Sequence, residues 1–251
     1  MALSSCFTLG GTYYCFAENA YWSNCFDPPL GYGPGCYNTW HFSVDLVVPT
    51  APSSLGSSSG VYLWNGLENK QCWGLVSGTC TLLQPVLEYY SSGIYAFAAI
   101  CVGSNGGGNC NTQFTTDAGF YPRVGDTLEL DIWDTSSGAS CWNVEVFDLT
   151  NGHSSGGLND QCQNNWGWQM PIATFAMEDH NINPECPSGN YPYEPSSHLP
   201  VKAQTVGNWL YFNQASINSN IVWASEADDG NCGWETTYEY PTSWEAFNMP
   251  T

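Results

Sequence analysis

The sequence predicts an all-β protein: an antiparallel sandwich of two sheets, stapled by disulfide bonds. Three observations predict this class: short apolar runs between turn residues, the absence of a sustained helical pattern, and an even number of cysteines. Of the 251 residues, 43% are hydrophobic and 15% aromatic, so the chain can bury a sizeable core. Sandwiches of this length commonly form a single unit.

Nine apolar runs are the candidate strands. They are rich in Val, Ile, Leu and aromatic residues, several alternate with a period of two, and connectors rich in Gly, Ser, Pro and Asn separate them. The runs span residues 41–48, 61–67, 81–90, 94–102, 126–133, 142–149, 171–179, 208–213 and 220–224. No segment keeps the i, i+3, i+4, i+7 pattern of an amphipathic helix, which favours two packed antiparallel sheets.

Composition divides the chain into three parts. Residues 1–37 are dense in Gly, Tyr and Cys, and are interpreted as a disulfide-tied N-terminal extension of loops and short strands. Residues 38–224 carry the apolar runs and form the predicted sandwich domain. Residues 225–251 are interpreted as a C-terminal tail packed on that domain.

The 12 cysteines predict a disulfide framework. There is no CxxC motif and no His at zinc-finger spacing from a cysteine pair, so metal binding explains them poorly. Cys72 with Cys80, and Cys101 with Cys110, are close enough in sequence to staple hairpins, although the sequence leaves the connectivity open. Disulfide bonds imply an oxidising compartment, so we expect a secreted, extracellular protein. Since Met1 is not followed by a basic region and a continuous apolar run, we expect that a leader has been removed or replaced.

The charge is strongly acidic. The chain has 23 Asp and Glu against 3 Lys and Arg, a formal net charge of −20. Lys70, Arg123 and Lys202 cannot form the basic surface that nucleic acids or anionic membranes require, so neither is expected as a partner. The shortage of cations also keeps the chain near neutral in acid, which suits an acid environment; ordinary surface acidity for solubility explains the composition equally well.

The common catalytic motifs do not fit. The G-x-S-x-G match at residues 56–60 lies in a Ser/Gly-rich connector with no helix after it, so it is not a nucleophile elbow. The four histidines show no HxH or HExxH spacing. We therefore expect no metal and no cofactor. What remains is carboxylate and amide chemistry on two predicted strands. On each strand, alternation places one set of side chains on a single face. The sets are Leu82, Gln84, Val86 and Glu88 on the first strand, and Thr174, Ala176, Glu178 and His180 on the second.

Six segments in the same order resemble the glutamic peptidases, the eqolisins. They are DLVVPTA at 45–51, YLWNGLE at 62–68, TLLQPV at 81–86, VGDTLELDI at 124–132, VEVFDLTNG at 144–152 and ATFAMED at 173–179. The resemblance implies a concanavalin-like, lectin-like β-sandwich as the catalytic domain. It also implies a catalytic pair, Gln84 and Glu178.

The resemblance further implies that Trp64, Glu68 and Thr174 contact the substrate. The chain departs from the family at residues 94–102, which carry no acid where the family has a Trp, Glu and Tyr wall. Pro85 is a second departure: it fixes φ and removes a ladder donor, so the strand of Gln84 is expected at a sheet edge or a bulge.

The implied activity is that of an endopeptidase working in acid. A glutamate, with a reference pKa of about 4.3, can take a proton from water and later give it to the leaving amine. A glutamine amide does not titrate and can hold the oxyanion at low pH. We expect Glu178 in the first role, Gln84 in the second, a polypeptide substrate and a monomer. The alternatives are a non-catalytic, lectin-like module that binds carbohydrate or protein, and a structural extracellular protein.

Overall fold

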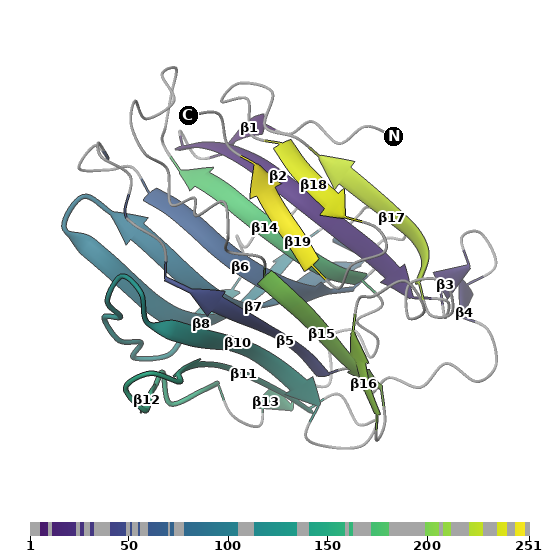
Figure 1. Ribbon diagram of the computed structural model, residues 1–251. Helices are drawn as coiled ribbons and strands as arrows, with labels where there is room; N and C mark the ends of the chain where they lie inside the picture. The colour runs from purple at the N-terminus through teal and green to yellow at the C-terminus, as the bar shows by residue number, and fades with distance from the viewer. Residues whose placement is uncertain are drawn as a thin grey trace.

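The computed structural model is a sandwich of two antiparallel sheets in stacked layers (Figure 1). The structure describes residues 6–9, 12–23, 26–27, 31–32, 41–48, 51, 55, 60–69, 71–72, 78–104, 113–134, 141–158, 161–162, 172–180, 199–205, 208–211, 221–227, 235–239 and 244–248. Side-chain surroundings are described mainly within residues 42–158 and for Glu178. Within these ranges every regular element is a strand, and none is a helix that could span a membrane.

The first sheet has eight strands, seven of them in the order β1-β2-β14-β6-β7-β8-β9, with β17 also paired to β2. The strands are β1 (Cys6–Leu9), β2 (Thr12–Ser23), β14 (Ile172–His180), β6 (Gly60–Glu68), β7 (Thr79–Tyr90), β8 (Gly93–Ser104), β9 (Gln113–Thr116) and β17 (Ile221–Ala227).

The second sheet has nine strands, seven of them in the order β12-β11-β10-β5-β15-β19-β18, with β13 paired to β11 and β16 to β15. The strands are β12 (His153–Ser154), β11 (Cys141–Asp148), β10 (Thr127–Asp134), β5 (His41–Val47), β15 (Leu199–Thr205), β19 (Trp244–Asn248), β18 (Glu235–Glu239), β13 (Gln161–Cys162) and β16 (Asn208–Tyr211). A separate two-stranded ribbon joins β3 (Phe26–Asp27) to β4 (Gly31–Tyr32).

The predicted fold class is confirmed, and each of the nine apolar runs overlaps one observed strand. The expectation of loops and short strands before residue 38 is wrong for β2, which has 12 residues and pairs with β14 from Tyr14 to Trp22. Aromatic and small apolar residues occur at both alternate positions of TYYCFAENAYWS, so no period of two marks this strand. Farther along the chain, β17 pairs with β2 and β19 with β15, so segments near both ends take part in the two sheets.

The hydrophobic core lies between the sheets, where β10 and β11 pack against β7 and β8. We call the side of the first sheet that faces this core its inner face and the opposite side its outer face. Asn65 identifies the inner face, because its Nδ2 donates to the backbone oxygens of Phe42 (3.4 Å) and Leu130 (3.3 Å) in the second sheet. Fully or almost fully buried inner-face residues of β6, β7 and β8 include Val61, Leu63, Leu67, Leu83, Leu87, Tyr89, Ala98 and Ile100.

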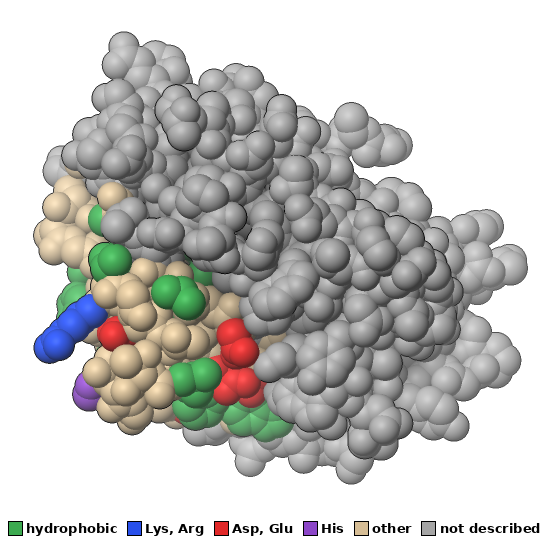
Figure 2. Space-filling model, in the orientation of Figure 1, with side chains coloured by type: hydrophobic (Ala, Val, Ile, Leu, Met, Phe, Trp, Pro, Cys, Tyr) green, Lys and Arg blue, Asp and Glu red, His purple; other side chains and the backbone are tan. Residues whose placement is uncertain are grey.

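Acidic side chains gather on the outer face of the second sheet over β5, β10 and β11, where Figure 2 shows a patch of Asp and Glu. Cross-strand pairing sets Glu129 opposite Asp45 and Asp131 opposite Glu145, which alternate with the buried Leu128, Leu130 and Ile132 of β10. Ser43 Oγ donates to Glu129 Oε1 at 3.0 Å. The alternation of apolar and acidic residues is what the strand period predicts for a sheet with one face in the core.

Pro85 places its strand neither at an edge nor at a bulge, so the expectation of one or the other is wrong. Strand β7 lies between β6 and β8, and Pro85 is paired in register with Ala98 on the β8 side. On the β6 side, pairing runs through Trp64↔Val86 and resumes at Leu67↔Leu83 in the same register. Proline has no backbone N–H to donate, and its position coincides with a two-residue gap in the β6–β7 ladder.

The predicted Cys72–Cys80 disulfide is present and closes the connection between β6 and β7. Asn69 ties the same connection, because its Oδ1 accepts from Thr81 N (3.1 Å) and its Nδ2 donates to Thr79 O (3.0 Å). Cys101 is also disulfide-bonded, and Cys110 lies outside the described residues. The staple fixes the start of β7, five residues before the Pro85 gap.

Candidate active site

Glu178 begins a row of polar side chains that crosses the outer face of the first sheet. In register, Glu178 of β14 lies opposite Tyr62 of β6, Tyr62 opposite Glu88 of β7, and Glu88 opposite Tyr95 of β8. Directly paired residues point to the same face, so these four side chains stand side by side. We call them the Glu178 row; each is partly exposed.

Gln84 belongs to a parallel row, which we call the Gln84 row. Gln84 pairs with Ala99 of β8, and the register across the Pro85 gap sets it opposite Gly66, which itself pairs with Thr174 of β14. Gly66 and Ala99 are the two smallest kinds of residue. No bulky side chain therefore stands beside Gln84 within its own row on β6 or β8, and Gln84 is partly exposed.

Trp64 lies between the two rows and contacts the predicted catalytic glutamate. Its Nε1 donates a hydrogen bond to Glu178 Oε2 at 3.1 Å. A Cβ added to Gly66 would lie 2.8 Å from the six-membered ring of the Trp64 indole and 2.8 Å from Leu82 Cδ1. The absence of a side chain at Gly66 thus lets the indole lie against β6 with its N–H directed at Glu178.

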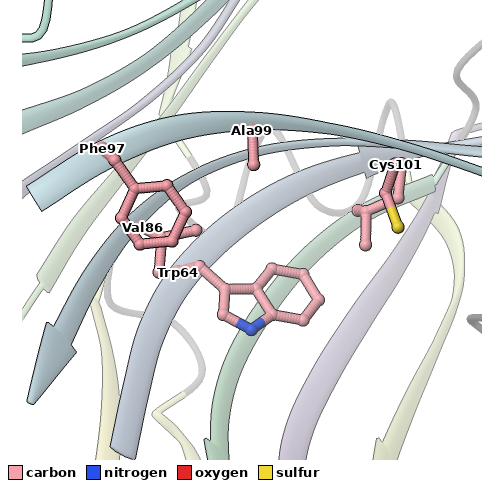
Figure 3. Close-up of a cluster of buried hydrophobic side chains, with 6 residues drawn as sticks. Trp64, Val86, Phe97, Ala99 and Cys101 are labelled. Carbon is pink, nitrogen blue, oxygen red and sulfur yellow. The ribbon is translucent and has the colours of Figure 1, made fainter. Parts of the chain in front are cut away.

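A buried apolar cluster packs around the indole on the same face of the sheet. Figure 3 shows Trp64, Val86 and Phe97 on the same side of the strands, and the full cluster is Trp64, Leu82, Val86, Phe97, Ala99 and Cys101. Trp64 is only 4% exposed, so its hydrogen bond to Glu178 forms at the border between apolar packing and the outer face. Reduced solvent at such a site strengthens a hydrogen bond to a carboxylate.

The two predicted catalytic residues share the outer face but not a row. Their strands, β7 and β14, are separated by β6, and their rows are four residues apart along the strands. Spacings of about 4.8 Å between strands and about 3.3 Å per residue put their Cα atoms about 16 Å apart in a flat sheet. Both side chains must therefore lean across Trp64 and Val86 for their ends to hold one water.

The other two residues that were predicted to contact the substrate are Glu68 and Thr174. Glu68 is the last residue of β6, and strand alternation puts it on the outer face. It pairs with Leu82 and Ile172 and is 8% exposed. Thr174 lies in the Gln84 row, and its side-chain surroundings are outside the described part of the structure.

A second contact on this face, besides that of Trp64 with Glu178, was not predicted from the sequence. Tyr62 Oη donates to Glu88 Oε1 at 2.9 Å, which puts a second carboxylate in the row of Glu178. The sequence did carry part of the signal, because Glu88 follows Gln84 at an even spacing. The Tyr62 partner depends on the register between two strands and could not be read from either strand alone.

Comparison with solved structures gives three matches that each cover 94% of this chain and 98% of the matched chain. Two are Scytalido-glutamic peptidase with transition-state analogues, at TM-scores of 0.56 and 0.57 and identities of 12% and 13%. The third is SCP-B, a member of the eqolisin family of peptidases in complex with the tripeptide Ala-Ile-His, at a TM-score of 0.54 and 12% identity.

This fold is that of the glutamic peptidases. The resemblance seen in the sequence is thus confirmed for the fold over nearly the whole chain. No protein-family model matches the sequence, and no curated protein is significantly similar to it. At 12–13% identity the match establishes the architecture, and the chemistry has to be argued from the outer face.

The outer face offers acid–base and hydrogen-bonding groups. Glu178 can accept or donate a proton, Gln84 can donate an amide N–H, and Trp64 fixes the orientation of the Glu178 carboxylate. Among the described residues, no three His, Cys, Asp or Glu side chains gather into a group that could hold a metal ion.

Proposed function

We propose that this protein is an endopeptidase that works in acid and hydrolyses polypeptides with Glu178 and Gln84. Glu178 removes a proton from water, the water attacks the carbonyl carbon of the peptide bond, and Gln84 donates its amide N–H to the oxyanion. Glu178 then transfers the proton to the leaving amine. No covalent intermediate and no metal are needed in this sequence of steps.

The hydrogen bond from Trp64 to Glu178 is the observation that carries the proposal. A general base must be held in one orientation toward its water, and a buried indole N–H on one carboxylate oxygen supplies that restraint. Glu178 shares the outer face with Gln84, in a fold that this chain has in common with the glutamic peptidases.

The environment in which we propose that the enzyme works follows from its disulfide bond and its charge. The Cys72–Cys80 disulfide favours an oxidising compartment, so we place the enzyme outside the cell. The excess of Asp and Glu over Lys and Arg leaves little net repulsion in acid. We expect the protein to act as a monomer on unfolded or flexible polypeptides.

The test is hydrolysis of a denatured protein from about pH 2 to about pH 7 by wild type, Glu178→Gln and Gln84→Ala. Activity should peak in acid, be lost in both variants and survive pepstatin, because no pair of aspartates sharing one proton is involved. Circular dichroism should show both variants folded. Cleavage retained by Glu178→Gln would contradict the proposal.

The second candidate is a lectin-like binding module. The partly exposed rings of Tyr62 and Tyr95 on the outer face favour it, because tyrosine stacks on sugars as well as on peptides. In that case wild type would cleave nothing, and Glu178→Gln would be harmless to binding.

A further inference from the structure

A polar side chain lies on the inner face of β6, where the strand otherwise contributes apolar residues. Asn65 is fully buried there, and its Nδ2 donates to the backbone oxygens of Phe42 at 3.4 Å and of Leu130 at 3.3 Å. The other inner-face residues of β6 are buried and apolar: Val61, Leu63 and Leu67. Asn65 therefore links β6 directly to the backbone of two strands in the second sheet. We call this pair of hydrogen bonds the Asn65 bridge.

The Asn65 bridge requires β6 to lie close to the second sheet. The side chain of asparagine is short, so the Asn65 Cα lies within about 7 Å of both accepting oxygens. Packed sheets are usually about 10 Å apart. An apolar side chain could fill the same space, but it could not bond to the backbone of the opposite sheet. The bridge thus sets the height of β6 above β5 and β10.

The same stretch of β6 lacks support from one neighbour in its own sheet. The β6–β7 ladder omits Asn65 and Gly66, and its register sets Asn65 opposite Pro85. Pairing with β14 is continuous here, so the support is missing only on the β7 side, which carries Gln84. Glycine also restricts the backbone less than any other residue. The Asn65 bridge therefore holds β6 at the point where its ladder is interrupted.

The bridge is poorly explained by stability alone. The Asn65 Oδ1 atom is buried and has no hydrogen-bond partner among the described residues. An unpaired buried acceptor destabilises the folded state, and both hydrogen bonds of the bridge are longer than the usual limit of about 3.2 Å. An apolar residue of the same shape should hold the sheets together as well or better. What asparagine adds is a defined position for β6.

We propose that Asn65 is a positioning residue that keeps the Trp64 indole on Glu178, an inference that rests on the proposed function of Glu178. Trp64 and Gly66 flank Asn65 and belong to the opposite, outer face. A rotation of β6 about its own axis would move the indole N–H away from Glu178 Oε2, to which it donates at 3.1 Å. The Asn65 bridge opposes this rotation, because it fixes the other side of the strand.

The test compares Asn65→Leu with Leu63→Ala, since residues 63 and 65 flank Trp64 and both lie on the inner face. Leucine has the shape of asparagine and cannot donate a hydrogen bond. Asn65→Leu should lower kcat by about 3- to 30-fold with little change in KM. Its midpoint of urea unfolding should stay the same or rise. Leu63→Ala is the matched control: it leaves a cavity, so its midpoint should fall while kcat of the folded protein stays near the wild-type value.

A double variant shows whether Asn65 acts through the indole. In a Trp64→Phe background, Asn65→Leu should cause no further loss of kcat, because the N–H that it positions is already absent. A lower unfolding midpoint with unchanged kcat in Asn65→Leu would mean that Asn65 is only structural, and would overturn the proposal. If Asn65→Leu does not fold, Asn65→Ala carries the same test on kcat and KM, since alanine also lacks the donor.

An NMR measurement separates this inference from the peptidase proposal. The signal of the Trp64 indole N–H is the one that disappears in Trp64→Phe, and its proton shift depends on the acceptor. In Asn65→Leu the signal should move toward its position in Glu178→Ala, whereas in Leu63→Ala it should stay at the wild-type position. No cleavage by wild type would overturn the peptidase proposal alone, and the NMR shift still decides the positioning role. A Trp64 signal that is the same in Asn65→Leu as in wild type overturns it.

Discussion

The two faces of the first sheet are made by alternate residues of the same strands, yet they differ in chemistry. On the inner face of β7, Leu83 and Leu87 are fully buried against the second sheet. On the outer face of the same strand, Gln84 and Glu88 are partly exposed, and Glu88 lies beside Tyr62 and Tyr95. The inner face packs the strands against the second sheet, whereas the outer face carries the polar groups on which the proposed activity depends. Consecutive residues should therefore separate stability from activity.

Gln84→Ala is expected to have the largest effect on activity. Loss of a single oxyanion donor reduces kcat by about 100- to 1,000-fold in other enzymes. Because Gln84 is partly exposed and its row neighbours are small, the free energy of unfolding should change by less than about 0.5 kcal/mol. Steady-state kinetics in acid and urea unfolding measure the two quantities. A variant that is as active as wild type would remove Gln84 from the mechanism.

Leu83→Ala, one residue earlier, should show the opposite pattern. Leu83 is fully buried on the inner face, so the truncation leaves a cavity and should lower the free energy of unfolding by about 2–5 kcal/mol. At a temperature where the variant is folded, kcat should remain near the wild-type value. Thermal and urea unfolding, followed by kinetics on the folded fraction, check both statements. A stable but inactive Leu83→Ala would mean that the two faces are not independent.

Trp64→Phe tests the contact between the apolar cluster and Glu178. The change keeps an aromatic ring and removes the N–H that donates to Glu178 Oε2. Hydrogen bonds to charged groups contribute about 1.5–3 kcal/mol, so kcat should fall by about tenfold or more. Trp133→Phe is the matched control, because Trp133 stacks on Phe147 in the second sheet, and kcat should be unchanged. Equal effects of the two changes would show that the N–H has no special role.

Asp148→Ala should affect stability alone, and to a degree that depends on pH. Asp148 Oδ1 accepts from Thr150 N and Asn151 N, both at 2.9 Å, in the turn after β11. Burial raises the pKa of this carboxyl, but the hydrogen bonds from Asn151 and Thr150 outweigh it and hold the pKa below its ordinary value. The stabilisation is therefore present above the ordinary aspartate pKa and is lost as pH falls through the lower folded-state value.

The variant should accordingly lose about 1–3 kcal/mol of unfolding free energy at about pH 6 and less at about pH 2. Urea unfolding at both pH values measures the difference. A loss that is the same at both would mean that the charge of Asp148 contributes nothing to the turn.

The sequence predicted the inner face better than the outer one. Apolar runs with a period of two located the core strands, because a strand with one buried face has an apolar residue at every second position. Strand β2 was missed because its aromatic and small residues fall on both alternate positions. Pro85 was expected at an edge or a bulge, since a single strand does not show that the backbone N–H missing from proline falls in a gap of the β6–β7 ladder.

For the candidate site, the sequence assigned Gln84 and Glu178 to strands and to faces, but not their neighbours. The Trp64–Glu178 hydrogen bond joins residues 114 positions apart, and it depends on the register between β6 and β14. The Tyr62–Glu88 bond likewise depends on the register between β6 and β7. Register is set by all the side chains of both strands together, so it has to be observed.

The most direct test of the central claim is a double-mutant cycle on kcat/KM in acid, with Glu178→Gln, Gln84→Ala and the double variant. If the two side chains act on one water and one oxyanion, the double variant should be scarcely slower than the worse single variant, because either change already disables the same step. Losses that multiply would contradict the claim, since they would mean that Gln84 and Glu178 contribute to separate steps.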